Sequence, residues 1–231
     1  MGARLLARRA AFVVPAVVVW TYLCLTVYEV ATDPGHGHHH AGPAVTGTAL
    51  SMWLVMLAAM MVPTVLPWVA AIARRGRMAG ALAFLSGYTV VWLLFAVGAT
   101  TLQALLSAAL SAGLGLEDGA MRGAALMLVG AYQWTPLRRS CLKHCESPVA
   151  FFLSHWRDGV RGAALMGVQH GTYCVGCCWL LMLSMLALGA MDVLSMAGFT
   201  LFALAEMYVP EWRPLSRAAG AVLVATGLYI L

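Results

Sequence analysis

Long apolar segments without charged residues alternate with short charged segments along the chain. Asp, Glu, Lys and Arg are absent from five runs, at residues 10–28, 34–73, 78–116, 162–191 and 218–231. A helix needs about 20 mostly apolar residues to cross the roughly 30 Å hydrocarbon core of a bilayer. The runs are apolar at consecutive rather than alternate positions, which excludes a transmembrane barrel, so backbone hydrogen bonding in lipid requires helices.

We therefore predict an all-α fold, a polytopic transmembrane helix bundle with six to seven spans. The predicted spans lie near residues 10–30, 49–72, 79–107, 120–137, 162–189, 192–209 and 215–231. The last two are short, and together they could form a hairpin that does not fully cross the bilayer. Residues 1–231 then form a single membrane domain, with an outer His-rich loop at 31–48 and a cytoplasmic Cys/His segment at 138–161.

Composition narrows the class of protein further. Apolar residues make up 62% of the chain and charged residues 10%, whereas soluble domains have about 45–50% and about 25%. A water-soluble globule has too little volume to bury that much apolar surface, so a soluble enzyme, a nucleic-acid-binding module and a disordered linker are excluded. The net charge of +5 resides in short segments between apolar runs, and we expect the lipid bilayer, not nucleic acid, as the partner.

The basic residues predict the orientation of the chain. If the amino terminus is cytoplasmic, 13 of the 14 Lys and Arg residues fall on the inner side, and Arg122 alone falls outside. This asymmetry follows the positive-inside rule. The first apolar run lacks a small-residue cleavage site, so we interpret it as an anchor rather than a cleaved signal.

Five residues with metal-binding side chains share one face of the predicted helix at 162–189: Met166, His170, Cys174, Cys177 and Cys178. Their spacing matches the 3.6-residue period of a helix. Cu(I) prefers thiolate, imidazole and thioether ligands, and Zn(II) accepts the first two. Packing of small apolar thiols is the alternative, but it leaves a buried imidazole without a partner. A redox disulfide is a third interpretation, which the spacing of thiols along one helix disfavours.

A methionine stripe occupies the predicted helix at 49–72: Met52, Met56, Met60 and Met61. Alone, such a stripe fits core packing. The 1.5 Å rise per residue, however, places Met56 and Met60 at the depth of the Cys/His face of the fifth span. If the two helices touch, their thioethers can serve as soft ligands. Pro63 and Pro67 lie just below and predict a kink.

The cytoplasmic segment carries a second set of candidate ligands, Cys141, His144 and Cys145. They could bind a metal ion at the inner surface, and neighbouring Lys and Arg residues are expected to lower the pKa of the thiols. A juxtamembrane amphipathic segment that contacts lipid through its basic residues is an equal alternative. His155 could join this set or anchor the interface.

Other polar residues suggest further roles. The histidines of the outer loop, His36, His38, His39 and His40, are typical of a loose collector of metal ions. Glu206 lies in a predicted span and is a functional candidate, or else a partner of Arg213 or Arg217. Glycines at 87, 98, 123 and 130 are expected to let helices approach closely.

Three motifs, at 132–145, 155–159 and 170–179, resemble a bacterial family of predicted metal-binding integral membrane proteins. The family is known mainly as a domain of unknown function, and one member is regarded as a membrane copper chaperone associated with a tyrosinase. The resemblance covers residues 49–231. It implies metal ligation by matching residues: Cys141, His144, Cys145, His170, Cys174, Cys177 and Cys178, with Met56, Met60 and Met61 from the methionine-rich span. Met207 stands where the resemblance implies a lysine.

We therefore expect a multi-pass protein of the bacterial inner (plasma) membrane that holds copper as Cu(I) with Cys, His and Met ligands inside the bilayer. Zinc is the alternative metal. The resemblance implies a copper-dependent client enzyme as partner, and ligand exchange requires no catalytic residue. Two other functions stay open: a metal-stabilised accessory subunit among other membrane subunits, and a membrane thiol oxidoreductase.

Overall fold

The computed structural model describes residues 43–111, 118–188, 199–203, 206 and 213–231. The predicted first span, the His-rich loop and most of the predicted span at 192–209 lie outside these residues. Within the described residues the fold is all-α, as predicted, and no strand occurs. The principal helices are α2 (Pro43–Ala73), α3 (Met78–Ser111), α4 (Asp118–Tyr132), α5 (Pro136–Cys145), α6 (Pro148–His155), α7 (Gly159–Leu188) and α9 (Arg213–Ile230).

Five of these helices, α2, α3, α4, α7 and α9, coincide with predicted spans. By length and hydropathy, α3 can cross a membrane through Met78–Ala109, and α2 qualifies as well when its two bent halves are counted as one span. No other helix among the described residues meets both criteria. The total of six to seven spans therefore stays a prediction.

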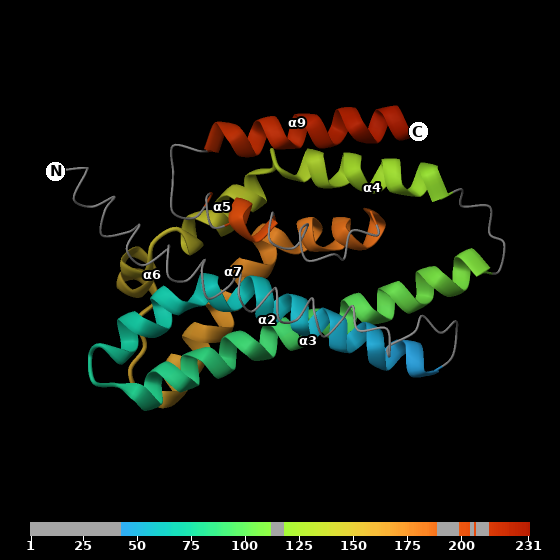
Figure 1. The fold of residues 1–231 in the computed structure, drawn as a ribbon. Coiled ribbons are helices and arrows are strands. Elements are labelled where there is room, and N and C mark those ends of the chain that lie inside the picture. The colour runs from blue at the N-terminus through green and yellow to red at the C-terminus, as the bar shows by residue number, and fades with distance from the viewer. Residues whose placement is uncertain (1–42, 112–117, 189–198, 204–205, 207–212) are drawn as a thin grey trace.

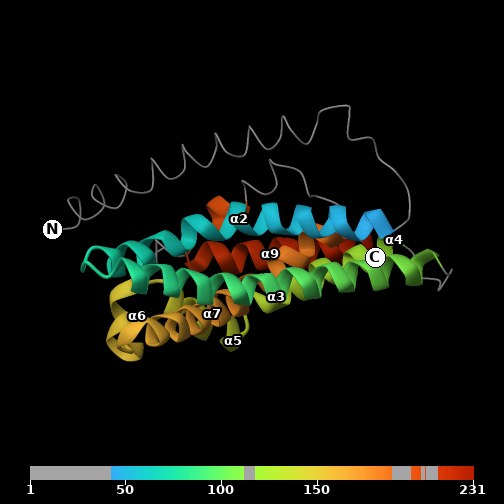
Figure 2. The same cartoon turned by 90° about the horizontal axis from the view of Figure 1, so that it is seen from below.

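α2, α3, α5, α6 and α7 share one apolar core. α3 packs against α2 and α7, while α4 packs against α9 and α7. α2 runs from right to left in Figure 1, α3 returns from left to right and crosses it, and α9 lies along the opposite edge of the bundle. Figure 2 shows these helices from below. α7 thus contacts both halves of the bundle, which makes it the central helix.

The predicted kink in α2 is present. The helix bends by 41° between Ala49–Ala58 and Met60–Ala73. Pro63 lies inside the helix four residues after this break, and a proline ring clashes with the carbonyl of the residue four positions earlier. The bend therefore has a steric cause in the sequence.

Glycines set how closely the helices approach, as predicted for three of four positions. A Cβ on Gly87 of α3 would overlap the backbone carbonyl of Ala164 in α7, and Gly123 and Gly130 of α4 meet backbone carbonyls of α9 in the same way. The expectation for Gly98 was wrong, because a Cβ there would have no neighbour within 4 Å. Gly98 lies on an exposed part of α3 that faces no other helix among the described residues.

The segment after α4 folds into two short helices. Thr135 caps α5 by accepting from the Arg138 amide, and Ser147 caps α6 by accepting from the Ala150 amide. Each cap is followed by proline at the first helical turn, where a missing N–H costs nothing. α5 then packs along α7 and α6 beside α5, which brings the Cys/His segment against the central helix.

Two basic segments that are far apart in sequence lie side by side. The turn between α2 and α3 bends at Gly76, whose φ of +71° favours glycine. Arg75 and Arg77 of this turn lie over the ring of Trp156, and Arg77 pairs with Asp158 at 3.6 Å. The turn thus contacts the segment between α6 and α7.

Candidate metal centre

Three buried thiols from two helices form a compact group. The Sγ atoms of Cys145 in α5 and of Cys174 and Cys177 in α7 all lie within 4.8 Å of one another. A trigonal site with metal–sulfur bonds of about 2.3 Å needs sulfurs about 4 Å apart. The group therefore matches the size of one soft metal ion after shifts of about an ångström or less.

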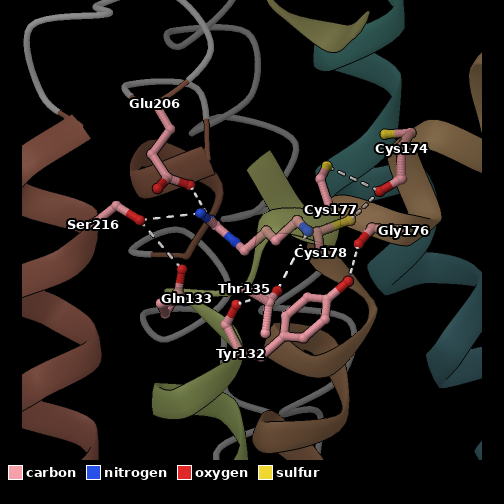
Figure 3. A network of polar contacts seen from close by, with 10 residues as sticks. Tyr132, Gln133, Thr135, Cys174, Gly176, Cys177, Cys178, Glu206 and Ser216 are labelled. Atoms are coloured by element: carbon pink, nitrogen blue, oxygen red, sulfur yellow. Dashed lines mark hydrogen bonds and ion pairs between the residues drawn. The ribbon is translucent and has the colours of Figure 1, made fainter. Parts of the chain in front are cut away.

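Cys177 and Cys178 lie one helical turn after Cys174, and both donate to its backbone. The carbonyl oxygen of Cys174 accepts from the Cys177 thiol at 3.1 Å and from the Cys178 thiol at 2.9 Å (Figure 3). Cys177 belongs with Cys145 to the three-thiol group, whereas Cys178 is buried but lies outside it. Of the three cysteines predicted as ligands on α7, Cys174 and Cys177 therefore belong to the thiol group and Cys178 does not.

Two residues near the thiol group, Met61 and Tyr88, lie outside the ligand set favoured by spacing. The Sδ atom of Met61 lies 3.9 Å from Cys174 Sγ, and the Tyr88 hydroxyl lies 3.4 Å from the same sulfur. Met61 was noted beside the methionine stripe, but helical spacing favoured Met56 and Met60, and the family resemblance named it as a ligand. Tyr88 is a polar group inside the long apolar run at 78–116, and this was the signal available in the sequence.

The other predicted thioethers are buried in the same core. Met56, Met60 and Met166 are each at most 4% exposed. Among the described contacts, the thioether that meets a thiol is that of Met61. The structure therefore brings the methionine-rich helix to the thiols, as expected if α2 and α7 meet, but through the neighbour of the predicted ligand Met60.

His170 is enclosed by aromatic rings. Its ring centroid lies 4.4 Å from that of Trp68, 5.7 Å from Tyr88 and 5.2 Å from Phe151. The side chain is 1% exposed, and Nδ1 has no hydrogen-bond partner within the described part of the chain. An unpaired buried polar atom is costly. Nδ1 of His170 is therefore a candidate to bind a metal ion or to form a hydrogen bond with a donor.

The predicted inner set of Cys141, His144 and Cys145 does not form one site. Cys145 joins the thiols of α7, while the Cys141 sulfur packs where Gly176 has no side chain. His144 instead stacks on Tyr173 at a centroid distance of 4.1 Å. The short helix α5 therefore distributes these ligands among three environments.

The expectation of lowered thiol pKa values in this segment was wrong. Burial, and then the proximity of Cys177, raise the pKa of Cys141. Interactions with Cys174 and Cys177, together with complete burial, raise the pKa of Cys145. The basic side chains of α5 do not offset these effects: Lys143 and Arg139 are exposed to solvent.

Arg138 is instead held in a buried polar network. Its guanidinium donates to Glu206 at 2.5 Å and to Ser216 Oγ at 3.0 Å, and Ser216 in turn donates to Gln133 (Figure 3). The expected partner of Glu206 was Arg213 or Arg217, whereas the ion pair among the described residues is with Arg138. Arg138 is 3% exposed and needs a counter-charge, whereas Arg217 is exposed and hydrated.

A second polar contact joins α4 to the central helix, α7. The Tyr132 hydroxyl donates to the carbonyl of Gly176, between Cys174 and Cys177 (Figure 3). Arg138 and Tyr132 together fix α5 and α4 against their neighbours. The helices that carry the thiol group are therefore held by polar contacts as well as by apolar packing.

Comparison with known proteins identifies the family. The chain matches no curated protein and no solved structure. A family model described as PpoB2, copper chaperone, matches residues 50–230, which include the residues of the thiol group and its neighbours. The chain therefore belongs to the PpoB2 family of copper chaperones.

Proposed function

We propose that this protein is a membrane copper chaperone that binds Cu(I) at Cys145, Cys174 and Cys177. The observation that carries the proposal is the convergence of three buried thiols from two helices with a thioether 3.9 Å away. Thiolate and thioether are the ligands that select Cu(I) over harder ions. His170 is a further candidate ligand, because its Nδ1 is unpaired among the described residues.

The Tyr88 hydroxyl can stabilise the charge of a Cu(I) ion bound by two thiolates. Two thiolates and one Cu(I) leave one negative charge in an apolar site, where a charge without hydrogen bonds is costly. The Tyr88 hydroxyl, 3.4 Å from Cys174 Sγ, can donate to that sulfur. The third thiol can then remain protonated. When it replaces a bound thiolate, its proton passes to the sulfur that leaves, so Cu(I) moves between ligands without a redox step.

Two features of the surface support a membrane location. Side chains on the outer face of α3, such as Leu82, Leu94 and Leu105, are 60–70% exposed, and lipid would cover them favourably. In Figure 1 the predicted cytoplasmic ends, including the α2–α3 turn, α5 and α6, gather at the left, and the carboxyl terminus with the start of α2 lies at the right. The inner membrane and several passes through it are parts of the proposal.

Copper binding by cysteine variants tests the proposed site. Anaerobically purified protein is loaded with Cu(I), and copper per chain is measured together with X-ray absorption. We expect one Cu(I) with sulfur ligands in the wild type, and a loss of affinity of about tenfold or more in Cys174→Ser and Cys177→Ser, because each removes a thiolate.

Cys141→Ser is the matched control, since this thiol is also buried but lies outside the three-thiol group. It should retain copper and its sulfur coordination. Unchanged binding in all three variants would contradict the proposed site.

A thiol oxidoreductase is the second candidate, because the structure places a thiol of α5 beside two thiols of α7. The sulfurs of Cys145 and Cys174, within 4.8 Å of each other, could form a disulfide between helices, whereas neighbouring thiols on one helix do not readily do so. Oxidation would transfer two protons and two electrons to a quinone-type acceptor or to the disulfide of a partner, which would be reduced to two thiols. Full burial of Cys145 and Cys174 hinders contact with such a partner, so copper binding is the better supported function.

A further inference from the structure

We propose that His144 and His155 form a second, two-coordinate Cu(I) site at the cytoplasmic edge, which passes the ion to the buried thiols. The inference rests on the proposed function. It adds a site where His155, together with His144, binds Cu(I) without a cysteine ligand. His144 lies on α5 and His155 ends α6, and their ring centroids are 5.6 Å apart. Both side chains are half-buried, so the pair lies between solvent and core.

Hydrogen-bond contacts favour the same tautomer in both rings. His144 Nδ1 lies 2.8 Å from the carbonyl oxygen of Ser140, and His155 Nδ1 lies 3.2 Å from that of Phe151. A carbonyl oxygen only accepts, which favours the hydrogen on each Nδ1. The Ser154 hydroxyl, 2.7 Å from His155 Nδ1, can accept as well, because it donates to backbone carbonyls of its own helix. In the neutral imidazole, the Nε2 lone pair is then left for a metal ion, which is the arrangement found in metal-binding histidines.

The spacing of the rings fits one bridging ion. Two imidazoles on a linear two-coordinate ion, with metal–nitrogen bonds of about 2 Å, have ring centroids about 6 Å apart. The observed 5.6 Å is close to this value, and the 70° angle between the rings keeps them from stacking on each other. Imidazole binds copper readily, so the pair needs no third ligand to hold Cu(I).

The chain connects this pair directly to the thiols. His144 precedes Cys145, and it stacks at 4.1 Å on Tyr173, which precedes Cys174. Two neighbouring pairs, one on α5 and one on α7, therefore face each other across the helix interface. An ion held by His144 is one residue away from the thiol group along α5.

Binding in the absence of the thiols tests the histidine site. In a variant with Cys145, Cys174 and Cys177 all changed to Ser, Cu(I) is titrated anaerobically and examined by X-ray absorption. We expect one copper with two nitrogen ligands, and binding weaker by about tenfold or more when His144→Gln or His155→Gln is added. Lys143→Gln, an exposed neighbour on α5, is the matched control and should leave binding unchanged.

A kinetic measurement on the chain with intact cysteines keeps the proposal testable if the serine variant does not fold. Transfer of Cu(I) from a chromophoric chelator to the thiols should be about tenfold slower in His155→Gln, with the final amount of sulfur-ligated copper unchanged. The histidine site would be overturned if the serine variant bound no copper, or if it bound copper through sulfur. Wild-type transfer rates in both histidine variants would overturn it as well. Copper on the thiols of the wild type would then still support the proposed function.

Discussion

Met61 is the methionine whose sulfur reaches the thiol group, at 3.9 Å from Cys174 Sγ. Met61→Leu keeps a side chain of similar volume but removes the soft sulfur. We expect the affinity for Cu(I) to fall about tenfold, the lower range for loss of a group next to a metal ligand. Competition with a chromophoric Cu(I) chelator under anaerobic conditions measures this change.

Met56→Leu is the matched control, because Met56 is equally buried in α2 and has no described contact with a thiol. Its affinity should equal that of the wild type. A larger loss in Met56→Leu than in Met61→Leu would show that the methionine stripe, rather than the neighbour of Cys174, binds copper.

At the residue scale, ligands that share one helix are predictable from spacing alone. The three-residue interval between Cys174 and Cys177 puts both on one face of α7. The partners from other helices, Cys145, Met61 and Tyr88, depend on the rotation of each helix about its axis. Periodicity within a single helix carries no information about that rotation, so spacing could not select Met61 over Met60.

At the scale of helices, the contact between α3 and α7 depends on small residues. Gly87→Ala would place a methyl group into the backbone of α7 at Ala164, and such overpacking costs about 1–3 kcal/mol. We expect the apparent Tm in detergent to fall by about 2–4 °C for each kcal/mol. Copper affinity should fall too, because Tyr88 is the next residue on α3.

Gly98→Ala on the same helix provides the control. Its Cβ meets nothing within 4 Å, and alanine favours a helix over glycine by about 1 kcal/mol. The apparent Tm should therefore stay the same or rise slightly. Equal destabilisation by both substitutions would contradict close packing at Gly87 as the cause.

Helix boundaries and helix contacts differ in how far local sequence determines them. Thr135-Pro136 and Ser147-Pro148 are start signals that mark where α5 and α6 begin. The position of α5 involves contacts between residues far apart in sequence, namely the buried pair Arg138–Glu206 and the Cys141 sulfur packed against Gly176 of α7. For this reason the inner Cys/His segment was predicted as a separate metal site, whereas Cys145 joins the thiols of α7.

At the scale of the whole molecule, the alternation of apolar and charged segments was enough to predict an all-helical bundle. Long runs without charge leave no alternative to helices in lipid, and the observed helices follow these runs. The same pattern indicates which ends share a side, because basic residues cluster at one set of ends. It does not indicate which helix lies at the centre, which depends on where glycines and polar pairs allow contact.

The proposed membrane orientation of the bundle leads to a prediction for the intact chain. The α2–α3 turn and the carboxyl terminus lie at opposite ends of the bundle (Figure 1). Arg75→Cys should therefore react with a membrane-impermeant maleimide in inverted vesicles, and Leu231→Cys in right-side-out spheroplasts, since both positions are exposed. The wild type is the background control, because its described cysteines are all buried. Reaction of both variants from the same side would contradict a bundle that spans the bilayer, because the roughly 30 Å apolar core separates the two ends only when the helices cross it.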